Sequence, residues 1–299
     1  MKNKSSITTL LLLTLFMSSI KAQLNPQGSG YFLNPYLMNP AYAGIQPGFV
    51  FDGALSAQLT AFDGAPFMQA VTATYGSAEA KVGTGIQFYK ERAGVIGRTV
   101  IKATYAYHLP LDYDENFLDL GISGGIHKEQ IDFHKVKGDQ EDQSLYDFNK
   151  RGAYLDGDFG MAFRNSRLTV QGSIPNLRRF LNTAFKEVAD RYLYMAGISY
   201  HHHSYGTTET VISPLFLYRV IQHEKDIWDA GMNISFQNGK LTGNAIYHSS
   251  GSFTGGIGTL YNDQLSILAQ FTSNTRDLKS YSNGQFEIAL KYALQQRPK

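Results

Sequence analysis

The 299-residue chain contains no cysteine, one tryptophan and nine prolines. Without thiols it can form neither a disulfide framework nor a thioether lipid anchor, so packing and hydrogen bonds must stabilise the fold. Its net charge of +2 lacks the basic excess of nucleic-acid-binding proteins, so no nucleic-acid partner is expected. Beyond the N-terminus no uninterrupted apolar run approaches the roughly 18 residues of a membrane helix, which argues against helical spans.

The first residues predict export from the cytoplasm. Lys2 and Lys4 precede the short apolar run ITTLLLLTLFMSSI, and Ala22 provides a small residue before a cleavage point at Gln23. The alternative is a membrane anchor, but the run is shorter than the roughly 18 to 20 residues that span a bilayer. Residues 1–22 are therefore predicted to be a cleaved signal peptide.

The chain is rich in the residues that the strands and turns of envelope proteins use: 19 Tyr, 19 Phe and 29 Gly. Apolar and polar residues alternate with period two in segments of about ten residues. In FEIALKYAL the charged Glu287 and Lys291 share one face, and the other face carries Phe286, Ile288, Leu290, Tyr292 and Leu294. A soluble β-sandwich also alternates, so this pattern alone leaves two all-β architectures open.

Strand length and number favour a membrane barrel. Most candidate strands are longer than the usual five or six residues and close to the roughly 9 to 11 of a tilted membrane strand. Their even number is what a closed bacterial barrel requires. The predicted fold is all-β, a transmembrane outer-membrane β-barrel of about 14 antiparallel strands over 49–294, with 295–299 as a periplasmic tail. The candidate strands are 49–60, 66–76, 80–90, 98–109, 116–128, 152–164, 166–174, 191–203, 209–221, 226–238, 239–249, 252–261, 263–273 and 284–294.

The connections support this interpretation. If both termini are periplasmic, every even-numbered connection should be short, and these connections are compact. The longest ones, 129–151, 175–190 and 274–283, all fall in the odd set and are expected to face outward. Such segregation is not expected of a sandwich.

Residues 23–48 precede the first strand and contain two Asn-Pro steps in YFLNPYLMNPAYAG. Asn-Pro favours turns over helix, so the segment should fold as consecutive tight turns. A barrel of about fourteen strands is too wide for its own side chains to fill, which makes this segment a candidate plug in the lumen. The alternative is a periplasmic lead-in at the barrel mouth. The residues proposed for the plug are Tyr31, Asn34, Pro35, Tyr36, Asn39, Pro40, Ala41, Tyr42 and Gly44.

A search for reactive groups favours a non-enzymatic protein. His201 and His203 share a strand face and could hold a metal ion, but polar interfacial histidines at a strand end are the preferred interpretation. No nucleophile elbow, phosphate-binding loop or thiol is present, although His108 and His127 could be placed near Asp residues. No catalytic residue, metal or cofactor is therefore expected.

Two outward connections are candidates for partner binding. The connection 129–151 is acidic but lacks the spacing of a calcium-binding EF-hand, so a solvated loop is preferred over a cation site. Apolar residues at helical spacing predict a short amphipathic helix over 176–191, which either caps the barrel or docks a surface partner. The candidate contact residues are Asp139, Glu141, Asp142, Asp147, Arg178, Arg179, Phe180 and Phe185.

The sequence QGSGYFLNPYLMNPAYAG resembles the N-terminal signature of the PorP/SprF family of the type IX secretion system of Bacteroidota. The resemblance continues, in order, in FDGAP, YAYHLPL, GSIPNL and RDLKSYSNGQFEIALKYAL, and it covers essentially the whole mature chain. It implies an outer-membrane barrel that anchors or helps to export large surface adhesins, in some members for gliding motility. The partners implied are cargo with a C-terminal sorting domain, periplasmic ring or lipoprotein components, and outer-membrane lipids and lipopolysaccharide.

Two other functions stay open. One is a transport barrel similar to the long-chain fatty-acid channel, in which YFLNPYLMNP would line a path for hydrophobic or small solutes. The other is a purely structural barrel bound to the periplasmic ring of the secretion machine through 23–30 and the short turns.

Overall fold

The structure is a computed structural model that describes residues 29–59, 64–77, 81–112, 116–133, 136, 143–150, 152–181, 192–205, 209–221, 225–274 and 283–294. The predicted signal peptide 1–22 and the predicted tail 295–299 lie outside the described residues. Within them no helix is long and apolar enough to cross a membrane.

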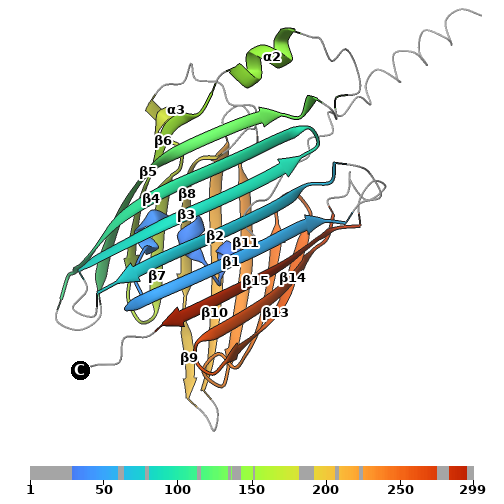
Figure 1. Ribbon diagram of the computed structural model, residues 1–299. Coiled ribbons are helices and arrows are strands. Elements are labelled where there is room, and N and C mark those ends of the chain that lie inside the picture. Colours follow the sequence, from blue (N-terminus) through green and yellow to red (C-terminus); the bar gives the residue numbers. More distant parts are fainter. Residues whose placement is uncertain are drawn as a thin grey trace, which may run out of the picture.

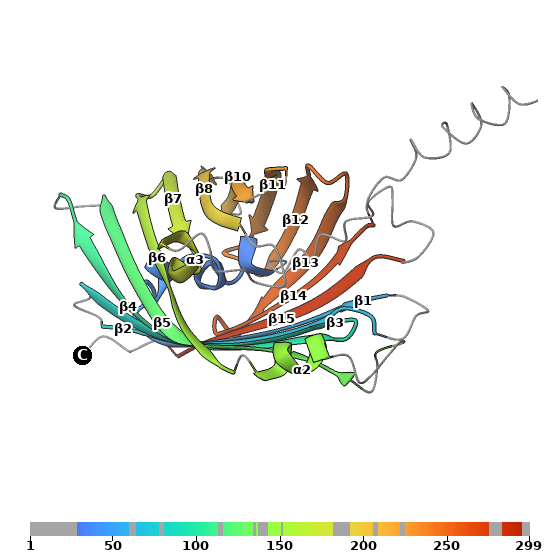
Figure 2. The ribbon, with the colours of Figure 1, turned by 90° about the horizontal axis from the view of Figure 1, so that it is seen from above.

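One antiparallel sheet closes into a barrel (Figures 1 and 2). Each strand from β1 to β7 pairs with the next along the chain, β8 and β9 both pair with β10, each strand from β10 to β14 pairs with the next, and β15 pairs with β1. The prediction of a closed 14-stranded barrel is confirmed. The strands are β1 Gly48–Gln58, β2 Phe67–Gly76, β3 Val82–Ala93, β4 Ile96–Pro110, β5 Phe117–Ile131, β6 Tyr154–Arg164, β7 Leu168–Ile174, β8 Tyr192–Tyr200, β9 His202–Tyr205, β10 Glu209–Ile221, β11 Ile227–Phe236, β12 Leu241–His248, β13 Phe253–Tyr261, β14 Leu265–Thr272 and β15 Gln285–Leu294.

Fifteen labelled strands make fourteen barrel positions because the predicted strand 191–203 is broken at His201 into β8 and β9. Both parts pair with β10, and the register places His201 opposite Ser213 and the last residue of β8, Tyr200, opposite Pro214. Proline has no N–H to donate to the ladder, so pairing is interrupted where it faces the neighbouring strand. Sequence alternation alone did not reveal this break.

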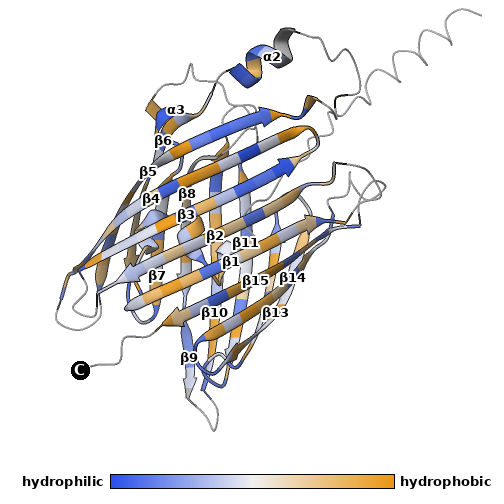
Figure 3. Cartoon of the chain, in the orientation of Figure 1, coloured by the Kyte–Doolittle hydropathy of each residue, from blue (hydrophilic) through white to orange (hydrophobic). Residues whose placement is uncertain are grey.

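Hydrophobic and hydrophilic residues alternate along the strands (Figure 3), and many large apolar residues are exposed on the outer face while many polar ones are buried inside. The outward residues of β15 predicted from alternation are indeed exposed, and Glu287 points inward and is buried. In β4, Ile101 and Tyr105 are exposed, and Lys102 and Thr104 are buried. This is the arrangement of a strand wall between lipid and a polar lumen.

The two ends of the barrel differ. The terminal rim is the end where β1 begins and β15 ends, and Phe49 pairs there with Leu294. The loop rim is the opposite end, and it carries the two short helices, α2 Gln143–Lys150 and α3 Leu177–Leu181 (Figure 1). Of the predicted helix over 176–191, the structure shows Leu177–Leu181 as α3, and 182–191 lies outside the described residues.

The outward face yields a depth-dependent stability prediction. Ile86 lies near the middle of β3 and faces outward, so Ile86→Lys should lower the free energy of unfolding of the protein in liposomes by about 2–4 kcal/mol. The matched control Leu241→Lys, at the terminal rim on β12, should cost at most about 1 kcal/mol. Urea titration of the refolded protein measures both values, and equal costs at the two depths would contradict the lipid-facing assignment.

Candidate functional site in the barrel lumen

Residues 29–47 lie inside the ring of strands as three short 3-10 helices (Figure 2). These are η1 Ser29–Tyr31, η2 Pro35–Leu37 and η3 Pro40–Tyr42. Each Asn-Pro step begins a turn, because proline fixes φ at the first helical position and the preceding asparagine has a non-helical backbone conformation. The Asn39 carboxamide oxygen caps η3 by accepting from the Ala41 N–H at 3.0 Å. The predicted consecutive tight turns are therefore present.

Side chains of this segment bond to strands on several sides of the lumen. The Asn34 amide donates to Thr72 on β2 at 3.0 Å, and the Tyr36 hydroxyl donates to Thr104 on β4 at 2.7 Å. Burial raises the pKa of Tyr36 to about 12, so the phenol keeps the proton that it donates. Asn39 is fully buried, and its amide donates to the Met161 carbonyl on β6 and the Gly172 carbonyl on β7, both at 3.2 Å.

Backbone carbonyls of the segment also accept bonds from the wall. Lys291 on β15 donates to the Leu33 carbonyl at 2.5 Å, and Ser173 on β7 donates to the Met38 carbonyl at 3.0 Å. His108 Nε2 on β4 lies 3.0 Å from the Ala43 carbonyl oxygen. Short 3-10 helices leave many of their backbone groups without an internal partner, and inward-facing side chains of the wall satisfy these three carbonyls.

The first turn is attached to a buried charged cluster near the loop rim. The Tyr31 hydroxyl donates to the Asp229 carboxylate at 2.6 Å and accepts from Arg219 at 3.1 Å. Arg219 forms an ion pair with Asp229, and His248 Nδ1 lies 2.6 Å from the other carboxylate oxygen. The segment therefore begins beside β10, β11 and β12 near the loop rim and ends at Gly48 on the terminal rim.

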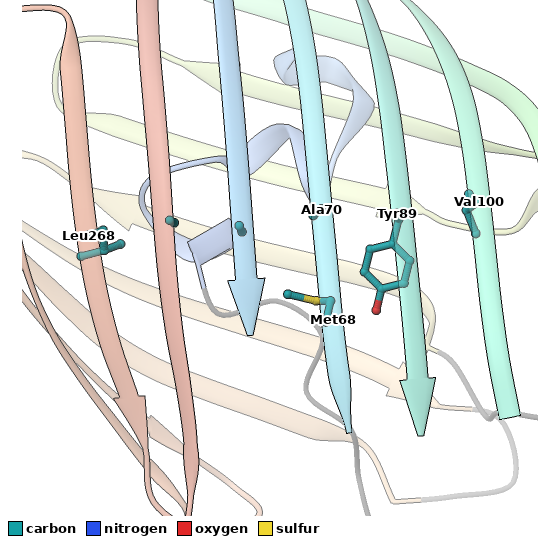
Figure 4. Close-up of a cluster of buried hydrophobic side chains, with 7 residues drawn as sticks. Met68, Ala70, Tyr89, Val100 and Leu268 are labelled. Atoms are coloured by element: carbon teal, nitrogen blue, oxygen red, sulfur yellow. The ribbon is translucent and has the colours of Figure 1, made fainter. Parts of the chain in front are cut away.

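Apolar contacts fill the remaining space between segment and wall. Leu33 and Leu37 pack against inward-facing residues of β1 to β4, β14 and β15, several of which are labelled in Figure 4. Phe32 packs against a second cluster that contains Tyr31 and Met38 of the segment and Leu217 of β10. Apolar clusters in the lumen thus hold the segment together with its hydrogen bonds.

Glycines on the inner wall provide the room for the turns. A Cβ on Gly121 would collide with the backbone of Pro40 and Ala41, and one on Gly160 would collide with Asn39. A Cβ on Gly85 would lie 2.6 Å from the Tyr36 hydroxyl oxygen. These glycines belong to the VGTGIQF, LGISGG and DGDFG strands, so the wall is shaped to the segment that it surrounds.

The other predicted plug residues also lie in the lumen. Pro40 and Ala41 are buried, Pro35 and Tyr42 are half-buried, and Gly44 has φ +70° where the chain passes Tyr75 and Gly83. Whether the segment blocks passage through the barrel stays a prediction.

The predicted contact residues at the loop rim are only partly described. Asp139, Glu141, Asp142 and Phe185 lie outside the described residues. Asp147 on α2 and Phe180 on α3 are exposed, and the Arg178 guanidinium lies over the Tyr154 ring at 5.2 Å. Arg179 is in α3, which leaves its role as a partner contact a prediction.

Sequence reasoning missed three buried ionic groups of the wall. They are Lys102 with Asp158, Asp119 with His108 and Arg164, and Asp229 with Arg219 and His248. Each ionic group joins neighbouring strands, except that Lys102 on β4 and Asp158 on β6 are separated by β5. The only signal in the sequence was that these charges occupy the polar face of alternating strands.

Two of these groups have a carboxylate beside a histidine, as hydrolases do, but neither presents a reactive hydroxyl to solvent. His108 Nε2 faces a backbone carbonyl, and His248 Nε2 lies 2.8 Å from Thr254, whose side chain is almost completely buried. His127 is fully buried beside Tyr154. A non-enzymatic role stays the prediction.

The three consecutive histidines lie at the terminal rim, where the sequence placed them at a strand end. His201 Nδ1 lies 2.9 Å from Ser213 Oγ, and His203 lies 3.6 Å from Glu209. Among the described residues no group of three or more His, Cys, Asp or Glu is arranged to hold a metal ion.

A closed antiparallel barrel with an apolar outer face and a charged interior defines a transmembrane outer-membrane protein. The family model described as type IX secretion system membrane protein PorP/SprF matches residues 20–292, and the chain belongs to this family. The resemblance seen in the sequence is thereby confirmed. No match is found among curated proteins.

Solved structures show the same fold at low sequence identity. The CymD monoaromatic hydrocarbon channel superposes with a TM-score of 0.50 and 10% identity, covering 93% of this chain and 95% of CymD. Omp33, an outer membrane protein of Acinetobacter baumannii, has a TM-score of 0.49 and 11% identity, covering 84% of this chain and all of Omp33. The CymD likeness supports the outer-membrane barrel fold and nothing finer.

The close approach of the segment to wall glycines can be tested by a matched pair of substitutions. Gly121→Ala on β5 should displace the Pro40–Ala41 backbone and destabilise the seated segment by about 1–3 kcal/mol, the cost of overpacking. Gly124→Ala on the same strand meets nothing within 4 Å and should leave the segment seated. Hydrogen exchange of residues 36–44 in detergent measures the difference, and equal protection in both variants would contradict the proposed fit.

Proposed function

We propose that this outer-membrane protein anchors, or assists the export of, a surface protein that carries a C-terminal sorting domain. Membership of a family described as type IX secretion system membrane proteins carries this proposal. In this model the loop rim faces the cell exterior and contacts the cargo. The terminal rim faces the periplasm, where ring or lipoprotein components of the secretion system are the expected partners, and lipids and lipopolysaccharide surround the wall.

The lumenal segment supports an anchor rather than an open channel. Its turns bond to β2, β4, β6, β7, β10, β11 and β15, so they are attached around much of the ring. Asn39 is fully buried, and Tyr31, Asn34 and Tyr36 are nearly so. Residues 23–48 are accordingly proposed to act as a plug after a signal peptide, 1–22, has been removed.

The loop rim offers surface for a protein partner. Tyr146 on α2 and Phe180 and Leu181 on α3 are exposed, and Leu181 is 79% exposed. Exposed large apolar side chains in polar loops are more typical of contact surfaces than of solvated ones. Gliding motility would be one use of an adhesin held here.

A transporter of hydrophobic or small solutes is the second candidate. The observation that favours it is the superposition with CymD, whose name describes a monoaromatic hydrocarbon channel. In that case the apolar contacts of Phe32, Leu33 and Leu37 would line a ligand path, and the segment would have to move during transport.

Purification of the tagged protein from outer membranes of its own host tests the anchoring model. A large surface protein with a C-terminal sorting domain should be identified by mass spectrometry in the eluate. Leu181→Ser should reduce its recovery, whereas the control Leu111→Ser, at an exposed leucine of the terminal rim, should not. A lone barrel carrying fatty acid would contradict anchoring and favour transport.

Planar-bilayer conductance tests the plug. The full chain should show little ion conductance, and deletion of residues 29–44 should open the lumen and give stable channel currents. Should the deletion variant not fold, Asn39→Asp offers a milder change, because it places a charge against the Met161 and Gly172 carbonyls and should cause intermittent opening. Equal conductance of the full chain and both variants would show that the segment does not plug the barrel.

A further inference from the structure

The lumenal segment has two parts that contact the wall in different ways. The outer part, residues 29–38, contains η1 and η2 and begins near the loop rim. The inner part, residues 39–47, contains η3 and leads into β1. The two ends of the outer part pack on each other, because a Cβ on Gly30 would lie 3.2 Å from Met38 Cγ. The outer part is therefore a compact unit.

The outer part bonds to the wall through the ends of side chains. The Tyr31 and Tyr36 hydroxyls and the Asn34 amide donate to β11, β4 and β2, respectively. From the wall, Lys291 and Ser173 reach two carbonyls of this part with their own side chains. Groups of this kind can bond to water instead, so these contacts can be broken while the backbone of the wall stays in place.

The inner part lies with its backbone against the backbone of the wall. A Cβ on Gly121 would collide with the backbone of Pro40, so only glycine allows this approach. By contrast, a Cβ on Gly85, which faces the outer part, would first meet the Tyr36 hydroxyl oxygen at the end of a side chain. The inner part also continues directly into β1 at Gly48. It is therefore fixed more firmly than the outer part.

One bond of the outer part can be broken without leaving a buried charge unpaired. The Tyr31 hydroxyl donates at 2.6 Å to Asp229, which is almost completely buried. Arg219 and His248 bond to the same carboxylate, so its charge stays paired when the hydroxyl leaves. A hydrogen bond to a charged group is also stronger than one between neutral groups. The Tyr31 bond is thus both strong and reversible.

We propose that residues 29–38 are a releasable part of the plug, locked by the bond from Tyr31 to Asp229, and that residues 39–47 stay seated when they leave. Release opens the lumen at the loop rim and uncovers Arg219 and His248 on the side where cargo contact is proposed. The inference rests on the proposed plug and describes its regulation. Movement of the two parts can be measured whether or not the segment blocks ion flow.

Cysteine labelling tests this two-part movement. The chain has no cysteine, so an introduced one is the sole thiol. Leu37→Cys reports on the outer part and Tyr42→Cys on the inner part, and both positions are half-buried. In nanodiscs, adding Tyr31→Phe should accelerate maleimide labelling of Leu37→Cys about tenfold, because a hydrogen bond to a charged group is lost. Labelling of Tyr42→Cys should not change.

A matched control keeps the type of substitution and changes the partner. Tyr36→Phe removes a bond to the neutral Thr104 hydroxyl, so it should accelerate labelling of Leu37→Cys far less than Tyr31→Phe does. The proposal is overturned if Tyr31→Phe accelerates both reporters equally, if it accelerates neither, or if Tyr36→Phe has the same effect. Failure of the plug itself would appear in the conductance of the full chain, which labelling does not measure.

Discussion

Backbone polar groups find no water in the hydrocarbon layer, and closure of the sheet is the constraint on which the rest of this structure depends. Pairing of β15 with β1 brings the beginning and the end of the barrel to one rim. Because the ring has fourteen positions, all the long connections leave from the other rim, where α2 and α3 lie. Closure also creates an interior that is too wide for the inward side chains to fill.

The Asn-Pro segment and the inner wall together fill this interior. Three turns occupy the lumen, and glycines stand on the inner wall where the turns approach it most closely, as Gly121 does at Pro40. The buried ionic groups have a related role, because an unpaired charge inside would cost several kcal/mol. The Asp229 carboxylate is paired with Arg219 and His248, and it also accepts a hydrogen bond from Tyr31. If the Tyr31 bond were lost, the two other partners would still neutralise the charge.

Much of the fold could be predicted from the sequence because membrane strands obey a strict period of two. One face of FEIALKYAL meets lipid and the other faces the lumen, so the alternation of apolar and polar residues predicts which side chains point outward. The ionic groups could not be predicted, since Arg219 and Asp229 meet only through the register of β10 with β11. The break at His201 was missed for a similar reason: its cause, Pro214, lies on the next strand and gives no signal within 191–203 itself.

Strand β10 links the charged cluster of the first lumenal turn to the break in the wall. Near the loop rim its Arg219 contacts the first lumenal turn, and near the terminal rim its residues 209–212 carry β9. Pro214 separates these two stretches, and the ladder to β8 resumes only at Leu215. Because β8 and β9 both pair with β10, the ring of strands stays closed on either side of the break. A proline in a membrane strand, which costs the sheet a hydrogen bond, is thus accommodated by a break in the neighbouring strand while closure of the barrel is preserved.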